Sequence, residues 1–177
     1  MPLTAIVLAA GEGTRMKSRH PKVVHNLLDK PIVWWTVRAA QAAGAERTIV
    51  VVGNHADEIK DALADFDAIE YVEQRERLGT GHAVRVVRDA VDGFSGPVVV
   101  INGDAPLLRP ETITALLDET RAHHNACTLL TMTPPDPTGY GRVVFSDGRV
   151  SGIVEHKDAT PEQRIHETEC NVGVYCF

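Results

Sequence analysis

The chain has 177 residues, of which 44% are hydrophobic and 24% charged, and its formal net charge is −6. This length and composition are typical of one globular domain, and an acidic protein as a whole does not attract nucleic acid or an anionic membrane surface. No stretch approaches the roughly 20 apolar residues that span a bilayer. The three cysteines are too few and too scattered for a disulfide framework. We therefore predict a cytoplasmic protein in which any phosphate site depends on a local basic cluster.

Short apolar runs in the first two thirds of the chain predict buried strands. They are Thr4–Ala10, Thr48–Gly53 and Pro97–Ile101. Runs that are apolar at every position are typical of strands covered on both faces, as in a parallel sheet.

Apolar residues at helical spacing lie between and after these runs. Helices are expected to begin at Pro31, with Gly44 as the C-terminal cap, and then at Asn54, Thr80 and Pro110. Alternating strands and helices predict an α/β fold with a Rossmann-like, mostly parallel sheet and helices on both faces.

The last third has a different pattern. Arg142–Phe145 and Arg149–His156 flank a Ser-Asp-Gly turn, which indicates a hairpin and hence a mixed or antiparallel edge. Asn171–Phe177 is an apolar strand pattern that nothing follows, and an uncovered edge invites association. We expect residues 1–177 to be a single domain that is truncated at its C-terminus, with a natural terminal strand as the alternative.

A glycine loop directly follows the first strand, in the segment Leu8–Met16 (LAAGEGTRM). Gly11 and Gly13 allow the backbone to approach a ligand, and successive N–H groups in such a loop bind anions. Arg15 adds a planar fork for phosphate oxygens, and Lys22 adds a second cation just after a proline. The spacing fits neither a dinucleotide-binding nor a Walker loop. The alternative is an ordinary turn beside two surface cations.

Two further motifs lie later in the chain, within the part that is predicted to form the same sheet. Gln74 carries both a donor and an acceptor, which suits a pyrimidine edge; Gly79 permits close approach to the ring, and Thr80 can donate its hydroxyl. Asp104 follows the third apolar strand, and a lone carboxylate there suits Mg²⁺, which takes its other ligands from phosphates and water. The alternatives are a plain helix start and a turn aspartate. His82 is expected to pack at the helix start rather than to act as a base.

The first motif, G-x-G-T-R-M followed by P-K, resembles the sugar nucleotidyltransferase family. The resemblance implies the nucleotide-diphospho-sugar transferase type of fold and a loop that wraps the nucleotide, with Arg15 and Lys22 as catalytic phosphate ligands. The implied loop contacts are Leu8, Ala9, Ala10, Gly11 and Gly13.

The remaining motifs resemble the N-acetylglucosamine-1-phosphate uridyltransferase branch of that family. Q-x-x-x-x-G-T, at Gln74, Gly79 and Thr80, reads uracil there, and G-D-x-P-L supplies the metal ligand, here Asp104. D-P-x-G-Y-G-R, V-E-x-x-D-A-T and N-x-G are matched in the last third. By position, the residues that contact the acetamido sugar are Gly141, Glu155 and Asn171.

The resemblance implies a Mg²⁺-dependent enzyme that joins UTP to N-acetylglucosamine 1-phosphate, with release of pyrophosphate. Full-length relatives carry a trimer-forming acetyltransferase domain, so this chain alone is expected to be a monomer. Arg77 and Asn102 depart from the pattern near the nucleotide, and the second metal ligand of the family lies beyond residue 177. A transferase for another base or sugar phosphate, and an inactive nucleotide-binding fragment, are the alternatives.

Overall fold

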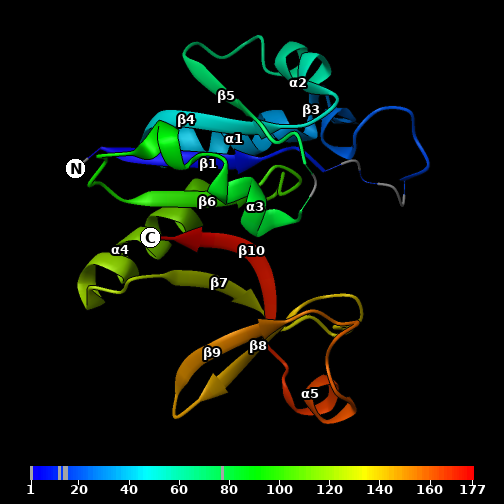
Figure 1. The fold of residues 1–177 in the computed structure, drawn as a ribbon, viewed down its shortest axis with the longest axis vertical. Helices are drawn as coiled ribbons and strands as arrows, with labels where there is room; N and C mark the ends of the chain where they lie inside the picture. The colour runs from blue at the N-terminus through cyan, green and yellow to red at the C-terminus, as the bar shows by residue number, and fades with distance from the viewer. Residues whose placement is uncertain (1, 12, 14–15, 77) are drawn as a thin grey trace. The chain divides into compact units, whose positions relative to one another are not determined.

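Four parallel strands form the centre of the larger of two units in the computed structural model, which describes residues 2–11, 13, 16–76 and 78–177 (Figure 1). The larger unit is Met1–Thr128 with Tyr175–Phe177, and the smaller is Leu129–Val174. The four strands are β1 (Leu3–Leu8), β4 (Ala45–Val52), β5 (Ile69–Glu73) and β6 (Val98–Asn102). Their parallel pairing confirms the expected sheet.

The strand order β5-β4-β1-β6 makes β1 a turning point of the topology. After β1 the chain builds β4 and β5 on one side, and it then returns to place β6 on the other side. In open α/β sheets, a crevice forms at the carboxyl ends of the strands where the order reverses, because the connecting segments diverge there. The carboxyl ends of β1 and β6 are therefore the expected position of a ligand site.

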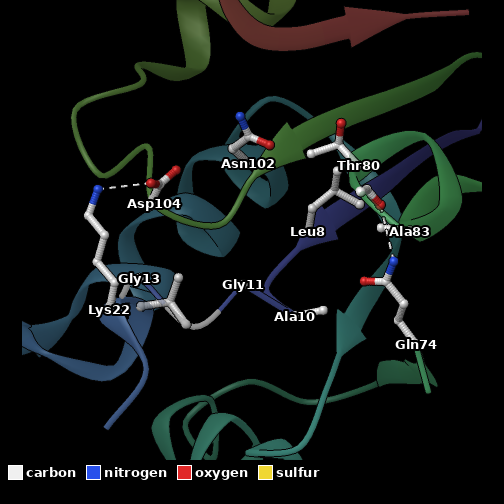
Figure 2. A pocket seen from close by; sticks show the side chains of 12 residues that line it. Leu8, Ala10, Gly11, Gly13, Lys22, Gln74, Thr80, Ala83, Asn102 and Asp104 are labelled. Atoms are coloured by element: carbon white, nitrogen blue, oxygen red, sulfur yellow. Dashed lines mark hydrogen bonds and ion pairs between the residues drawn. The ribbon is translucent and has the colours of Figure 1, made fainter. Parts of the chain in front are cut away.

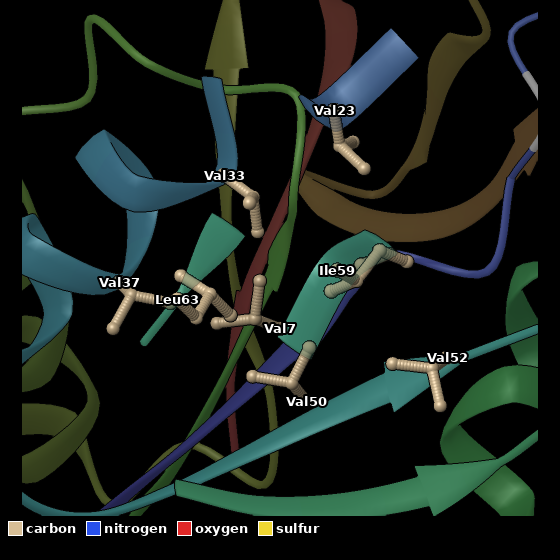
Figure 3. Close-up of a cluster of buried hydrophobic side chains, with 9 residues drawn as sticks. Val7, Val23, Val33, Val37, Val50, Val52, Ile59 and Leu63 are labelled. Atoms are coloured by element: carbon tan, nitrogen blue, oxygen red, sulfur yellow. The ribbon is translucent and has the colours of Figure 1, made fainter. Parts of the chain in front are cut away.

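Helices cover both faces of this sheet, as predicted. On one face, α1 (Ile32–Ala42) and α2 (Ala56–Ala62) pack over β1 and β4 through a buried aliphatic cluster (Figure 3). On the other face, α3 (Thr80–Arg85) packs Ala83 over the alternate strand residues Ile6 and Ile49. Successive side chains of a strand point to opposite faces, so all-apolar strands supply both clusters. A further helix, α4 (Pro110–His123), contacts α1.

Ile59 of α2 is 1% exposed and belongs to the cluster of Figure 3. We expect Ile59→Val to lower the free energy of unfolding by about 0.5–1.5 kcal/mol, because it removes one buried methyl group. Ile165, which is 71% exposed, provides the matched control, and Ile165→Val should change stability by less than about 0.5 kcal/mol. Urea unfolding checks both values, and equal losses would contradict the assigned core.

The smaller unit contains an antiparallel hairpin, β8 (Arg142–Ser146) and β9 (Arg149–Val154), at the position predicted from the Ser-Asp-Gly turn. Most of β7 (Thr128–Met132), α5 (Pro161–His166) and the start of β10 (Cys170–Cys176) also lie there. The end of β10 belongs to the larger unit, where Val98 and Phe177 exchange two backbone hydrogen bonds of 3.0 and 2.9 Å. That exchange is antiparallel pairing, so the mixed edge is confirmed. The prediction of one domain over residues 1–177 stays a prediction.

Several predicted boundaries were wrong. β1 ends at Leu8 rather than Ala10, because the glycine loop begins there. Asn54 is not a cap, since α2 begins at Ala56 with His55 as its N-cap residue, and Pro31 precedes α1 instead of lying inside it. Elements that the sequence reading omitted are β5, β7, α5 and the short hairpin of β2 (Asn26–Leu27) and β3 (Lys30–Pro31).

Helix length and polarity also bear on the membrane prediction. Across the ranges that the structure describes, every helix is too short or too polar to cross a bilayer.

Candidate functional site

A cavity of about 410 Å³ opens at the carboxyl ends of the parallel strands in the larger unit (Figure 2). Three segments line it: the loop after β1, the start of α3 together with the residues after β5, and the loop after β6. The lining residues are Leu8, Ala10, Gly11, Gly13, Lys22, Val23, Gln74, Gly79, Thr80, Ala83, Asn102 and Asp104. Residues predicted from three separate motifs therefore surround one space.

The glycine loop passes close to the segment that carries Lys22. Gly13 has a φ of +63°, and a Cβ added to it would lie 2.5 Å from Cβ of Lys22. Only glycine adopts such a conformation readily and leaves room for the approach. Arg15 and Arg77 lie outside the described residues. The methyl group of Ala9 is buried in the core cluster and does not line the cavity. The predicted contact between Ala9 and the nucleotide therefore stays a prediction.

Lys22 and Asp104 form an ion pair in the lining of the cavity. The ammonium nitrogen of Lys22 lies 2.8 Å from Oδ2 of Asp104, and the two side chains are 39% and 41% exposed (Figure 2). A half-exposed ion pair contributes little to stability, so separating the two groups costs little. The lysine therefore remains available to a phosphate, and the carboxylate to a cation.

Two hydrogen bonds hold the loop that carries Asp104 in place. The backbone N–H of Gly103 donates to the carbonyl of Leu8 at 2.8 Å, and the hydroxyl of Thr36 donates to the carbonyl of Gly103 at 3.2 Å. Gly103 leaves no room for a side chain, because an added Cβ would lie 2.9 Å from the Leu8 carbonyl oxygen. The end of β1 and the loop after β6 are thus held close together.

Glu58 of α2 contacts two histidines, and one of them, His20, lies in the segment that carries Lys22. His20 lies 2.6 Å from one carboxylate oxygen of Glu58, and His55 lies 2.7 Å from the other. The hydrogen bond from His20, and then that from His55, lowers the pKa of Glu58 below its ordinary value. Because the pKa of Glu58 is lowered, its carboxylate contributes stability above the ordinary glutamate pKa. That contribution is lost as the pH falls through the lowered pKa. At neutral pH the Glu58 carboxylate is therefore free to accept from His20, which lies two residues before Lys22, although a pair this exposed contributes little to stability.

Gln74 lies beside the start of α3 and is only 5% exposed. Its amide nitrogen donates to the carbonyl oxygen of Gly79 at 3.1 Å and lies 3.1 Å from Nδ1 of His82. Gly79 has a φ of +91°, which lets the chain turn sharply into α3, and Thr80 is the first residue of that helix. The predicted base-reading residues are thus together at one end of the cavity.

The three predicted sugar-binding residues are together in the smaller unit. The backbone N–H of Asn171 donates to the carbonyl of Gly141 at 2.9 Å. A Cβ on Gly141 would lie 3.6 Å from Oε1 of Glu155. The side-chain oxygen of Asn171 accepts a hydrogen bond from the backbone of Gly173 at 3.0 Å. These three residues, which are far apart in the sequence, therefore lie close together within that unit.

The donor set of the cavity restricts what metal it can hold. Among the residues that the structure describes, no group of three or more His, Cys, Asp or Glu side chains is placed to hold an ion. Asp104 supplies a single carboxylate, which fits a hard cation that takes its remaining ligands from phosphate oxygens and water. It does not fit a protein-enclosed zinc or calcium site.

Sequence reasoning missed two lining residues, Val23 and Ala83. Ala83 lies about one helical turn after Thr80. A helix that begins at Thr80 therefore places both residues on the same face, and the predicted helix start was a sufficient signal for Ala83. Val23 follows Lys22 directly and is largely buried, and no pattern in the sequence marks it. Asn102, which departs from the pattern of the resembled family, is the last residue of β6 and lines the cavity.

Comparison with known proteins identifies one family and a common fold. Residues 5–160 match the model of the MobA-like NTP transferase domain. The chain is 49% identical over 175 residues to the bifunctional protein GlmU of Geobacter metallireducens, covering 98% of this chain and 37% of that protein. It is 45% identical over 172 residues to GlmU of a Cyanothece species, covering 97% and 38%. The chain thus spans about two fifths of the length of these curated relatives.

Solved structures share the architecture at low identity. A UDP-glucose pyrophosphorylase complexed with UDP-glucose superposes with a TM-score of 0.75 at 20% identity, covering 100% of this chain and 76% of that one. A putative glucose-1-phosphate thymidylyltransferase from Bacillus anthracis gives a TM-score of 0.78 at 18% identity, covering 99% and 71%. These likenesses establish the fold.

Proposed function

The chain belongs to the family of MobA-like NTP transferase domains, and from this premise we propose that it is a nucleotidyltransferase that joins UTP to N-acetylglucosamine 1-phosphate. The products are UDP-N-acetylglucosamine and pyrophosphate. The observation that carries the proposal is the meeting of Lys22 and Asp104, 2.8 Å apart, beside a glycine loop at the carboxyl ends of β1 and β6. The likeness to curated GlmU proteins supports the choice of substrates.

The proposed reaction requires charge neutralisation rather than a general base. A phosphate oxygen of the sugar 1-phosphate is already anionic at neutral pH, and it attacks the α-phosphorus of UTP. The bond between that phosphorus and the bridging oxygen of the β-phosphate breaks, and pyrophosphate leaves with the electron pair. Lys22, together with Arg15, offsets the charge that builds on the phosphates, and this kind of electrostatic stabilisation dominates phosphoryl transfer.

Asp104 is the proposed ligand for Mg²⁺. When bound, the cation neutralises phosphate charge and orients the triphosphate. The chain's own part is to hold Asp104 in the lining of the cavity through the Gly103 and Thr36 contacts. The loop residues that would contact the nucleotide are Leu8, Ala9, Ala10, Gly11 and Gly13. Its base would be read by Gln74, Gly79 and Thr80, and the acetamido sugar would be contacted by Gly141, Glu155 and Asn171.

The remaining expectations stay part of the same proposal. Residues 1–177 would act as one nucleotidyltransferase domain in the cytoplasm, with small-molecule partners and no nucleic-acid or membrane partner. In isolation the chain would be a monomer.

Pyrophosphate release tests the proposal. The chain is incubated with Mg²⁺, N-acetylglucosamine 1-phosphate and UTP, CTP, dTTP or GTP in turn, and then with UTP and glucose 1-phosphate. We expect the highest turnover with UTP and the acetamido sugar, and calorimetry should show UTP binding. Binding of UTP without pyrophosphate release under any of these conditions would contradict the catalytic assignment and leave a nucleotide-binding protein.

Asp104→Asn should raise the metal concentration needed for half-maximal turnover by about tenfold or more, since loss of groups around a metal commonly costs 10- to 100-fold in affinity. Asparagine keeps the size of the side chain and still accepts a hydrogen bond from Lys22, so only the charge is lost. Asp118→Asn on α4 is the control, because Asp118 is 69% exposed beside Arg121 and outside the cavity. An unchanged Mg²⁺ titration for Asp104→Asn would remove this residue from the metal site.

A further inference from the structure

The side-chain amide of Gln74 is held at its nitrogen by two groups on the turn into α3. Nε2 carries two hydrogens, and it lies 3.1 Å from the carbonyl oxygen of Gly79 and 3.1 Å from Nδ1 of His82. Both donors of the amide are therefore engaged within the protein, which leaves Oε1 as the group that a ligand meets. In Figure 2 the nitrogen of Gln74 is turned toward α3, and its oxygen is turned to the side of Ala10.

The orientation of the amide follows from chemistry at the Gly79 carbonyl. That oxygen only accepts, and it already receives the backbone N–H of Ala83 at 3.1 Å. The reverse orientation of Gln74 would place Oε1 against this oxygen, with two acceptors facing each other and no proton between them. The nitrogen must therefore face Gly79.

The same reasoning assigns the role of His82. Since the neighbouring atom of Gln74 is a donor, Nδ1 of His82 must accept, and the single proton of the neutral ring is on Nε2. His82 is half-buried and is not among the described residues that line the cavity. We therefore expect His82 to act on a ligand through Gln74.

We propose that His82 is a positioning residue which, on the premise of the function proposed above, makes Gln74 present an oxygen acceptor to the base. An acceptor at this place selects a pyrimidine whose ring nitrogen carries a hydrogen between two carbonyls, as in uracil and thymine. Cytosine presents a lone pair at that nitrogen, so it meets Oε1 acceptor to acceptor. With the Gly79 carbonyl as its only partner, the amide of Gln74 could rotate about that single hydrogen bond. The second contact, to His82, fixes the orientation of the amide.

Three variants separate positioning from bulk structure. His82→Leu removes the acceptor and places an apolar side chain of similar size at the start of α3. His82→Asn restores one, because its amide oxygen is as many bonds from the backbone as Nδ1 is. Arg85→Ala changes an exposed residue of the same helix outside the cavity. Circular dichroism establishes that each variant is folded.

Calorimetric affinities for UTP and CTP are the first readout. For His82→Leu we expect a loss of UTP affinity of about five- to tenfold, the usual effect of one hydrogen bond, and a smaller UTP-to-CTP ratio. His82→Asn and Arg85→Ala should keep both values within about twofold of the parent. An unchanged UTP-to-CTP ratio in His82→Leu would overturn the proposal.

Nitrogen-15 NMR of the parent protein without nucleotide is the second readout, and it does not depend on activity. We expect the neutral His82 ring to carry its proton on Nε2, with Nδ1 unprotonated. A proton on Nδ1 would overturn the inference even in a protein that binds UTP. Conversely, a parent protein that prefers UTP but releases no pyrophosphate would contradict the proposed catalysis. The affinity measurements and the NMR measurement would still test the role of His82 in that case.

Discussion

Replacing Lys22 by alanine is expected to slow pyrophosphate release by about 10²- to 10³-fold, the range found when one preorganised charge-stabilising contact is removed. The ammonium group lines the cavity, 2.8 Å from Asp104, and is half-exposed. It can therefore stabilise negative charge on the triphosphate and on the leaving pyrophosphate. Because this charge builds most strongly in the transition state, the loss should appear chiefly in kcat. Steady-state kinetics with UTP and N-acetylglucosamine 1-phosphate measure it.

Lys60→Ala is the matched control for that experiment. Lys60 is also an exposed lysine near an aspartate, 3.7 Å from Asp57 on α2, but it does not line the cavity. Its replacement should leave turnover within about twofold of the parent, as for most surface changes. If Lys22→Ala behaved like Lys60→Ala, the electrostatic role of Lys22 would be wrong.

Gly13→Ala should weaken UTP binding by about 10- to 100-fold while the fold is retained. The added methyl group meets Cβ of Lys22 at 2.5 Å, and φ is +63°, where an L-residue is strained. Overpacking of this kind costs about 1–3 kcal/mol, and each 1.4 kcal/mol is tenfold in affinity. The loop relaxes away from Lys22 in the free protein, and binding must then restore the strained arrangement. Calorimetry with UTP measures the loss.

Gly44→Ala separates backbone strain from the clash. Gly44 has a φ of +95° after the end of α1, but a Cβ there would have nothing within 4 Å. We expect this control to lower stability in urea unfolding and to leave UTP affinity unchanged. Equal losses of UTP affinity in the two variants would show that the approach of Gly13 to Lys22 is not what shapes the site.

Much of the larger unit was predictable because its signals are local. Runs such as Thr48–Gly53 are apolar at every position, and this alone indicates strands covered on both faces. β5 was missed for the opposite reason: its residues Ile69–Glu73 mix apolar and charged side chains, as an outer strand of the sheet does. The helix boundary at Asn54 failed because a capping residue type does not by itself determine where the first helical hydrogen bond forms.

The sequence by itself determined the chemistry available to this protein: a glycine loop after the first strand, two cations near it, an amide and a carboxylate after later strands. These are properties of residue type and spacing, which local pattern reports. Only the tertiary structure decided that Lys22 meets Asp104 across 82 positions of sequence, that Ala9 is buried in the core, and that His82 contacts the amide of Gln74. Contacts of that kind depend on where packing places each donor and acceptor in space, and the order of residues along the chain does not contain those distances.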